Sequence, residues 1–234
     1  ACATSSLAFG PASLLVQRGR AAHALAFTSS HNAAAERQFR FPNEYGVQKK
    51  ETTTTTVSGA GSIVLGRTPQ PIAVRAFTLG RIVDWHHQNA SDMGIAMAPA
   101  ALDTLHAHLA QTNSTIDDYD WILTGDLSKA GFGFLCDLLS QEGIHADSRF
   151  NDCGLMIYDR LTQDVHAGGS GCGCAASVLC SFILPQIACH RLKNVLFLAT
   201  GALMSPTSVQ QGESIPGIAH LLHLSDQPNS PEQL

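Results

Sequence analysis

The heptapeptide GGSGCGC at residues 168–174 is the stretch of sequence that decides the fold. Its glycines give the backbone great freedom around two thiols, which is compatible with a metal site, a redox pair, a nucleophile turn or a tight strand-to-helix junction. The following segment, 174–192, has the pattern of a helix interrupted by Pro185. We therefore interpret the heptapeptide as a strand-to-helix turn that lines a pocket.

A similar pattern occurs near the beginning of the chain. Cys2 opens a segment, 3–18, that we expect to be helical despite Pro11. In both copies a strand follows the helix at nearly the same distance and a polar loop then leads to another strand. These strands are ALAFTSS (24–30) and GAGSIVL (59–65) in the first copy, and VLFLATG (195–201) and GIAHLLHL (217–224) in the second.

The region between the two copies alternates strands with helices. Strands are predicted within 71–84 and 119–125, and helices over 94–110, starting from Pro99, and over 129–143. This alternation favours an α/β fold, and the two copies indicate a duplicated domain with approximate twofold symmetry.

Composition excludes several classes of protein. The 234 residues are 44% hydrophobic and carry a net charge of −5 without a long basic run, so nucleic acid is not an expected partner. No stretch has the length and apolarity of a membrane span. Seven cysteines, an odd number, without a recognisable signal peptide predict reduced thiols and a cytoplasmic type of protein that is not secreted.

Cofactor and metal signatures are weak. Cys172 and Cys174 form C-x-C, which lacks the spaced pairs typical of zinc, and the dinucleotide fingerprint is not matched, so no metal or cofactor is expected. Cys136, Cys180 and Cys189 lie on predicted helices and are interpreted as small core residues.

Two polar residues after strands allow two interpretations each. His31 follows a strand end, with Asn32, Arg37 and Arg40 nearby, and is either a binding residue or an ordinary histidine. Asp126 lies just after a strand, where α/β folds place functional groups, or it caps the next helix.

Several motifs resemble one family. ACATSS at 1–6 resembles the nucleophile elbow of the thiolase and β-ketoacyl synthase superfamily, with Cys2 as the thiol. Longer motifs over residues 2–224 resemble the stage V sporulation protein AD family of spore-forming Firmicutes. They are SSHNAAAERQFRFPNEYG, MGIAMAPAALDTL, YDWILTGDL, NDCG, HAGGSGCGC and ATGALMSPTSVQQGESIPGIAH.

The resemblance implies a thiolase-like fold, in which two βαβαβ halves are layered α-β-α-β-α. It also implies that the first strands and helices of the N-terminal half, those before the nucleophile, are missing from this sequence. On this interpretation the chain is a fragment, in which residues 1–90 are the remainder of the N-terminal half and residues 91–234 are the C-terminal half.

The resemblance further implies that the chemistry was lost. Active ketoacyl synthases carry a histidine in the stretch that matches WILTGDLSK, and an asparagine or second histidine in the stretch that matches GSGCGCAAS. Here those positions hold Gly125 or Asp126, and Cys172. A thiol nucleophile needs a base or an oxyanion-stabilising donor nearby, so Cys2 is expected to occupy the nucleophile position without catalysis.

The family is associated with movement of dipicolinic acid into the developing spore, and its AD member is regarded as the binder. The resemblance therefore implies a pocket between Cys2 and Cys172, where helix N-termini, with Arg37 or Arg40, would receive two carboxylates. The expected ligand-binding residues are Cys2, His31, Asn32, Arg37, Arg40, Asp126, Gly171, Cys172, Gly173, Cys174, Thr200 and Gly201.

The expected partners are membrane-embedded proteins of the same sporulation system, which would hold the protein peripherally at the spore inner membrane. Thiolase-like proteins usually dimerise, so a homodimer is a further expectation. Two alternatives remain: an acyltransferase that uses Cys2 with His31 or Asp126, and a scaffold for membrane proteins in which the pocket is a relic.

Overall fold

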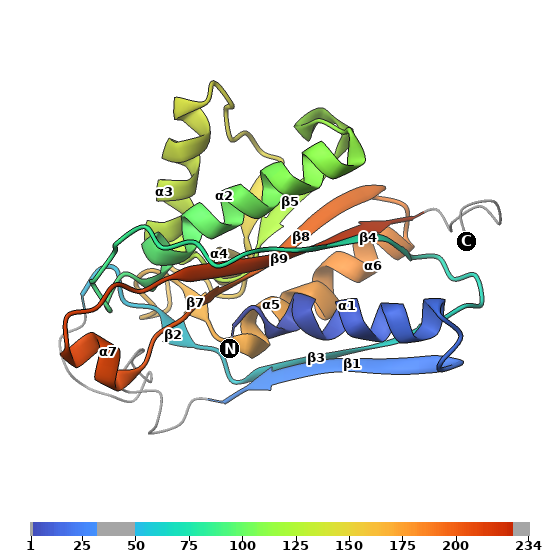
Figure 1. Ribbon diagram of the computed structural model, residues 1–234, viewed down its shortest axis with the longest axis horizontal. Coiled ribbons are helices and arrows are strands. Elements are labelled where there is room, and N and C mark those ends of the chain that lie inside the picture. Colours follow the sequence, from blue (N-terminus) through green and yellow to red (C-terminus); the bar gives the residue numbers. More distant parts are fainter. Residues whose placement is uncertain (1, 32–49, 227–234) are drawn as a thin grey trace.

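The computed structural model describes residues 2–31 and 50–226 and shows a layered α/β fold (Figure 1). In chain order the described elements are α1 (Thr4–Gln17), β1 (His23–Ser30), β2 (Thr55–Thr56), β3 (Gly59–Gly66), β4 (Ala73–Leu79), α2 (Met93–Thr112), the 3-10 helix η2 (Ile116–Asp118), β5 (Trp121–Thr124), α3 (Ser128–Gln141), β6 (Phe150–Asp152), α4 (Cys153–Met156), β7 (Gly169–Ser170), α5 (Cys172–Val178), the π-helix η3 (Leu179–Ile183), α6 (Leu184–Ala188), β8 (Asn194–Ala202), α7 (Pro206–Gln210) and β9 (Gly217–Ser225).

The duplication predicted from the sequence is confirmed. In the first copy α1 leads into β1, which pairs antiparallel with β3, so that His23 faces Gly66 and Ser30 faces Gly59. In the second copy α5, η3 and α6 lead into β8, which pairs antiparallel with β9. The same order of helix, strand, connection and antiparallel strand therefore occurs twice.

The second copy belongs to a five-stranded sheet with the order β4-β9-β8-β5-β6. β5 runs parallel to β6 and β8, whereas β9 runs antiparallel to β8 and β4. β8 and β9 are buried along nearly their whole length, which explains their continuous apolar runs. The division of the chain at residue 90 stays a prediction; β4, which precedes it, lies at the edge of this sheet.

Four layers are visible: the β1–β3 ribbon, then α1, α5 and α6, then the five-stranded sheet, then α2 and α3 (Figure 1). One apolar cluster joins Phe9 of α1, Leu179 of η3 and Phe197 of β8. A second cluster joins Met97 of α2 and Leu198 of β8 on the opposite face. The five-stranded sheet thus lies between two helical layers.

The outer face of the β1–β3 ribbon is apolar and exposed. Within residues 2–31 and 50–226 no helix covers it, and Leu25, Phe27 and Val64 are 61%, 66% and 65% exposed. Leu25 and Val64 face each other across the ribbon. This face has the character of a surface that another layer would cover.

Helix α2 corrects the sequence prediction at its start. It begins at Met93, so Pro99 lies inside the helix rather than in its first turn. A proline inside a helix costs about 3 kcal/mol. Close packing offsets this cost, because a Cβ on Gly131 of α3 would lie within 2.5 Å of the Gly94 backbone, and Ala98 and Ala100 are fully buried.

The interruption predicted at Pro185 is confirmed, but the helix begins at Cys172 and ends at Ala188. A π-helical turn over Leu179–Ile183 precedes Pro185, which stands in the first turn of α6. A proline there needs no backbone N–H of its own.

A buried polar cluster lies between α2 and the five-stranded sheet. His108 is fully buried, and its Nδ1 is 2.9 Å from Thr78 Oγ1 and its Nε2 3.1 Å from Tyr119 Oη. The rings of Tyr119 and His223 meet edge to face at 5.1 Å. Burial lowers the pKa of both His108 and His223 to about 4, which favours neutral rings in the folded protein.

No helix in the described part of the chain combines the length and apolarity that a membrane crossing requires.

Candidate functional site

The candidate site lies where the parallel strands β5 and β8 end and the glycine turn begins. Asp126, directly after β5, is 2% exposed. Its Oδ1 accepts a hydrogen bond from Thr200 Oγ1 at 2.9 Å, and its Oδ2 accepts from Ser170 Oγ at 2.8 Å and from the Gly171 N–H at 3.0 Å. One carboxylate therefore holds together both strand ends and the turn that precedes α5.

A second buried carboxylate supports the same region. Asp152 ends β6 and accepts hydrogen bonds from Thr124 Oγ1 at 2.7 Å and from the Leu127 and Ser128 N–H groups at 2.9 Å each. Burial, with a contribution from Asp126, raises the pKa of Asp152 to about 7, while these hydrogen bonds act in the opposite direction.

The sequence allowed Asp126 to be either a functional group or the cap of the next helix, and the structure decides about the cap. The N–H groups at the start of α3 are bound by Asp152, whereas Asp126 binds the glycine turn, so the interpretation of Asp126 as the cap of the next helix is wrong. Ser128 adds a further connection, because its hydroxyl donates to the Gly169 carbonyl at 2.7 Å.

The GGSGCGC segment is confirmed as a strand-to-helix turn. Gly169 and Ser170 form β7, which pairs parallel with β2, and α5 starts at Cys172. Gly171 has φ +111° and ψ 163°, a conformation that residues with a side chain rarely adopt. A Cβ on Gly173 would lie 2.2 Å from the Gly59 carbonyl oxygen, so the turn also needs glycine where it meets β3.

Several N–H groups of the turn already have acceptors in the protein. The Gly173 N–H donates to Ser30 Oγ at 2.8 Å, and that hydroxyl donates to the Val57 carbonyl at 2.6 Å. The Cys174 N–H donates to the Gly171 carbonyl at 3.0 Å. Together with the bond from Gly171 to Asp126, these contacts fix the turn and reduce the number of donors that α5 offers to a ligand.

The Cys2 segment packs onto the end of β8. Cys2 is 7% exposed, and a Cβ on Gly201 would lie 3.1 Å from the Ala3 nitrogen. One turn along α1, Ser6 Oγ accepts the Ala199 N–H at 3.2 Å. The fold thus brings the Cys2 segment to the same strand end as Thr200, which is bonded to Asp126.

Backbone atoms surround Gly125, one of the two residues, with Asp126, that the resemblance matches to a histidine of active ketoacyl synthases. A Cβ on Gly125 would lie 3.1 Å from the Thr200 nitrogen and 3.2 Å from the Ala199 Cα. The Gly125 carbonyl is 4.0 Å from the Cys174 sulfur, the second thiol of the C-x-C motif. The end of β5 therefore has room for glycine and little more.

His31 lies at the margin of this arrangement. It is exposed, and its Nδ1 is 3.3 Å from Ser58 Oγ. Its neighbour Ser30 makes the contact with Gly173 instead. Asn32, Arg37 and Arg40, the remaining expected ligand-binding residues, lie outside the described residues.

Sequence reasoning missed Asp152, Ser170 and Ser30. Asp152 is the last residue of β6, and Asp126 lies just beyond β5, so the same rule of polar groups at strand ends would select Asp152 within the NDCG motif. Ser170 belongs to the GGSGCGC segment and Ser30 to the strand segment 24–30, but their partners Asp126 and Gly173 are distant in sequence. Helical and strand periodicities do not predict such pairs.

The thiols differ in their surroundings. No disulfide joins any of the seven cysteines, all of which lie in the described segments. Burial raises the pKa of the Cys153 thiol well above its ordinary value, and Asp152 acts in the same direction.

The interpretation of Cys136, Cys180 and Cys189 as small core residues is wrong for Cys189, which is exposed, while Cys136 and Cys180 are half-buried.

Within the described ranges, His, Cys, Asp and Glu side chains do not gather in threes as metal ligands do.

Solved structures of condensing enzymes share this architecture. OleA of Xanthomonas campestris with cerulenin bound superposes with a TM-score of 0.57 at 13% identity, over 96% of this chain and 62% of that one. For 3-oxoacyl-[acyl-carrier-protein] synthase III of Aquifex aeolicus VF5 the TM-score is 0.53 at 12% identity, over 94% and 64% of the two chains. The protein therefore has the thiolase-like fold of ketoacyl synthase III-type enzymes.

Within this fold class, the chain belongs to the Stage V sporulation protein AD (SpoVAD) family, and the model of that family matches residues 1–225. It is 50% identical over 220 residues to Stage V sporulation protein AD of Bacillus subtilis (strain 168), a match that covers 94% of this chain and 65% of that relative. The chain thus spans slightly less than two thirds of the length of the relative. The resemblance inferred from the motifs is confirmed.

Proposed function

We propose that this protein binds dipicolinic acid and supports its uptake into the developing spore, with a pocket between Cys2 and Cys172 and without catalysing acyl transfer. The proposal rests on a retained thiolase-like fold in which, as the resemblance implies, the positions of the usual acid–base partners of the nucleophile hold Gly125 or Asp126, and Cys172. Gly125, one of the two candidate positions, is closed in by the backbone of Ala199 and Thr200. Three protein donors already bind the oxygens of Asp126, which supports a structural role for this carboxylate.

Recognition would combine shape with charge. Dipicolinic acid is a flat pyridine with two carboxylates, and the small residues at the ends of β8 and α5 suit a flat ring. The N–H groups of Gly171 and Gly173 already have protein acceptors. Much of the charge complement would therefore come from cations such as Arg37 or Arg40, which can bind a carboxylate bidentately.

Equilibrium binding tests the proposal. Calorimetric titration of the purified protein with dipicolinate should give a dissociation constant at least about tenfold lower than with benzoate, because the second carboxylate adds a charge-assisted contact. Equal affinities for the two compounds would end the idea. A Cys2→Ser variant should keep dipicolinate binding, since the thiol is not required as a nucleophile.

An acyltransferase is the competing candidate, and the burial of Cys2 beside the end of β8 gives it a specific basis. Intact-mass spectrometry after incubation with acyl-CoA separates the two functions. An acyl group on Cys2 of the protein, but not of the Cys2→Ser variant, would favour the enzyme over the receptor.

The proposal includes peripheral attachment to membrane-embedded proteins of the same sporulation system at the spore inner membrane, and self-association into a homodimer. Co-purification of a tagged protein from sporulating-cell membranes, with and without a high-salt wash, tests the attachment. Sedimentation measurements on the purified protein test the dimer. If pocket substitutions left spore dipicolinate unchanged while surface substitutions lowered it, the scaffold alternative would be preferred.

A further inference from the structure

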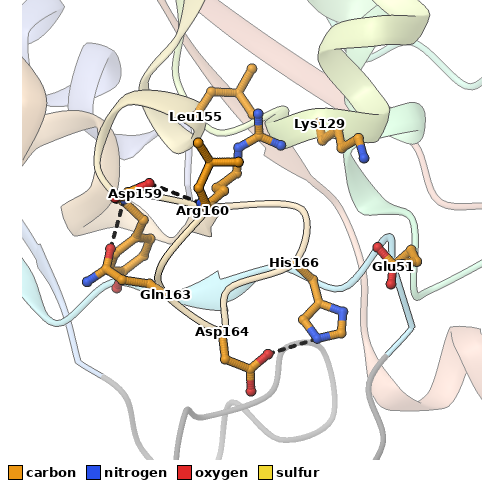
Figure 2. A pocket seen from close by; sticks show the side chains of 10 residues that line it. Glu51, Lys129, Leu155, Asp159, Arg160, Gln163, Asp164 and His166 are labelled. Carbon is orange, nitrogen blue, oxygen red and sulfur yellow. Dashed lines mark hydrogen bonds and ion pairs between the residues drawn. The ribbon is translucent and has the colours of Figure 1, made fainter.

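A cavity of about 630 Å³ lies outside the thiol site, between the start of α3 and the loop that joins α4 to β7 (Figure 2). Its wall includes Lys129 of α3, the loop residues Asp159, Arg160 and His166, and Glu51, which comes from the segment before β2. The volume lies within the range of small-molecule binding sites.

Backbone hydrogen bonds fix the walls of this cavity. The Lys129 N–H donates to the Ala167 carbonyl at 2.9 Å, and the Ala167 N–H donates to the Thr53 carbonyl at 3.1 Å. The Thr55 N–H donates to the Gly168 carbonyl at 2.9 Å. Loop, helix start and the β2 segment are therefore joined before any ligand arrives.

Two acidic groups in the wall are engaged by the loop itself. The Asp159 carboxylate accepts from Thr162 Oγ1 at 2.7 Å and from the Leu161 N–H at 3.0 Å, and these hydrogen bonds lower its pKa. Asp164 Oδ1 lies 3.0 Å from His166 Nε2 (Figure 2), and the other ring nitrogen of His166 faces the Lys50 carbonyl at 3.1 Å. Neither acid contacts the cations of the cavity.

Two cations in the same wall have no such partner. Within the described residues, the side chains of Lys129 and Arg160 make no ion pair or hydrogen bond, and both are exposed. In Figure 2 the Arg160 guanidinium extends toward the side from which Lys129 comes, while Asp159 and Gln163 face one another on the other side. The apolar surfaces of Leu155 and Tyr158 complete the lining.

We propose that this cavity binds a small dianion, a dicarboxylate or a phosphate, between Lys129 and Arg160. The guanidinium can bind two oxygens of one anionic group, and the ammonium can bind the remaining charge. The carboxylates of Glu51, Asp159 and Asp164 lie in the same wall and oppose anion binding, and Glu51 is the one of the three without a partner among the described residues. The inference concerns a second site and does not depend on dipicolinate binding at the thiol site.

Calorimetric titration at low ionic strength tests the proposal, with malonate and inorganic phosphate as separate probes. The double variant Lys129→Gln/Arg160→Gln should bind at least one probe about tenfold more weakly than the unmodified protein, because two charge-assisted contacts are lost. Arg67→Gln/Lys193→Gln is the matched control, because it removes the same charge from two exposed residues that do not line the cavity. The control should retain affinity within about twofold.

Two further comparisons test the effect of Glu51 and distinguish the two kinds of anion. Glu51→Gln should tighten binding several-fold. If the unmodified protein binds malonate more tightly than phosphate, the cavity is a dicarboxylate site. The reverse order of affinities identifies a phosphate site. Equal losses in the double variant and its control would overturn the inference, and so would the absence of measurable binding for both probes. Circular dichroism of the double variant checks its fold, and the two single variants serve as replacements if it unfolds.

Discussion

The carboxylate of Asp126 and the hydroxyl of Thr200 form a buried hydrogen bond of 2.9 Å. The Asp126 N–H also donates to the Thr200 hydroxyl oxygen at 3.2 Å, so two hydrogen bonds join the two strand ends. The remaining carboxylate oxygen holds Ser170 and Gly171, so this pair connects the sheet to the start of α5.

Removal of this carboxylate should destabilise the protein strongly. Asp126→Ala leaves the Ser170 and Thr200 hydroxyls and the Gly171 N–H without their acceptor, and we expect a loss of about 3 kcal/mol or more in the free energy of unfolding. Thr200→Val, which removes one donor, should cost about 1–2 kcal/mol. Urea denaturation followed by circular dichroism measures both, and equal effects of the two substitutions would contradict this account.

Introduction of an imidazole at Gly125 should not produce catalysis. Gly125→His places a Cβ at 3.1 Å from the Thr200 nitrogen, which is tighter than ordinary van der Waals contact. We expect a loss of about 1–3 kcal/mol from overpacking and no gain of acyl transfer to Cys2. Thermal unfolding and intact-mass spectrometry with acyl-CoA test the two parts, and a stable variant that acylates Cys2 would refute the prediction.

Stability should depend on the buried histidines at mildly acidic pH. The pKa of His108 and of His223 is about 4 in the folded protein and near 6.5 when unfolded. Between these values the unfolded chain binds more protons, so their contribution to stability is lost as the pH falls from about 6.5 to about 4. His108→Gln should therefore flatten the decline in unfolding free energy between pH 7 and pH 5.

The contribution of Asp152 to stability should change with pH in the opposite direction to that of the two histidines. Its pKa of about 7 exceeds the ordinary 3.8, so the folded protein binds more protons between these values, and this contribution falls as the pH rises. Asp152→Asn should steepen the loss of stability on acidification, relative to the unsubstituted protein, in the same denaturation series. An unchanged pH profile would show that the hydrogen bonds from Thr124, Leu127 and Ser128 keep the carboxylate ionised.

The outer face of the β1–β3 ribbon should govern self-association. Phe27 is 66% exposed, so Phe27→Ser should change the free energy of unfolding by less than about 1 kcal/mol while lowering light scattering at high concentration. Ala26, its neighbour on the inner face, is 3% exposed, and Ala26→Asp should unfold the protein by burying an unpaired charge. Unchanged scattering for Phe27→Ser would show that another surface drives association.

The fold was readable from the sequence because its determinants are local and repeated. Alternating segments predicted the strands and helices, and the recurrence around Cys2 and Cys172 predicted the duplication. The start of α2 was missed because packing of Gly94 against Gly131 overrides the local preference of Pro99. Tertiary contact outweighs propensity at such positions.

The sequence predicted the candidate site only in part. Asp126 and the glycine turn stood out by residue type and position, but the bonds of Asp126 to Ser170 and Thr200 join residues 44 and 74 positions apart. Helical and strand periodicities carry no information at that separation. The role of Asp152 at the start of α3 was hidden for the same reason, since the acid comes from a different strand.

The pairing of β4 with β9 has a consequence for how the chain acquires its structure. The two strands, Ala73–Leu79 and Gly217–Ser225, are neighbours in the sheet although nearly all of the second half separates them along the chain. Contacts of such long range are made late and slow the approach to the native state. During synthesis on the ribosome β4 emerges before its partner strand, and we expect the backbone groups along its edge to stay unpaired over that interval.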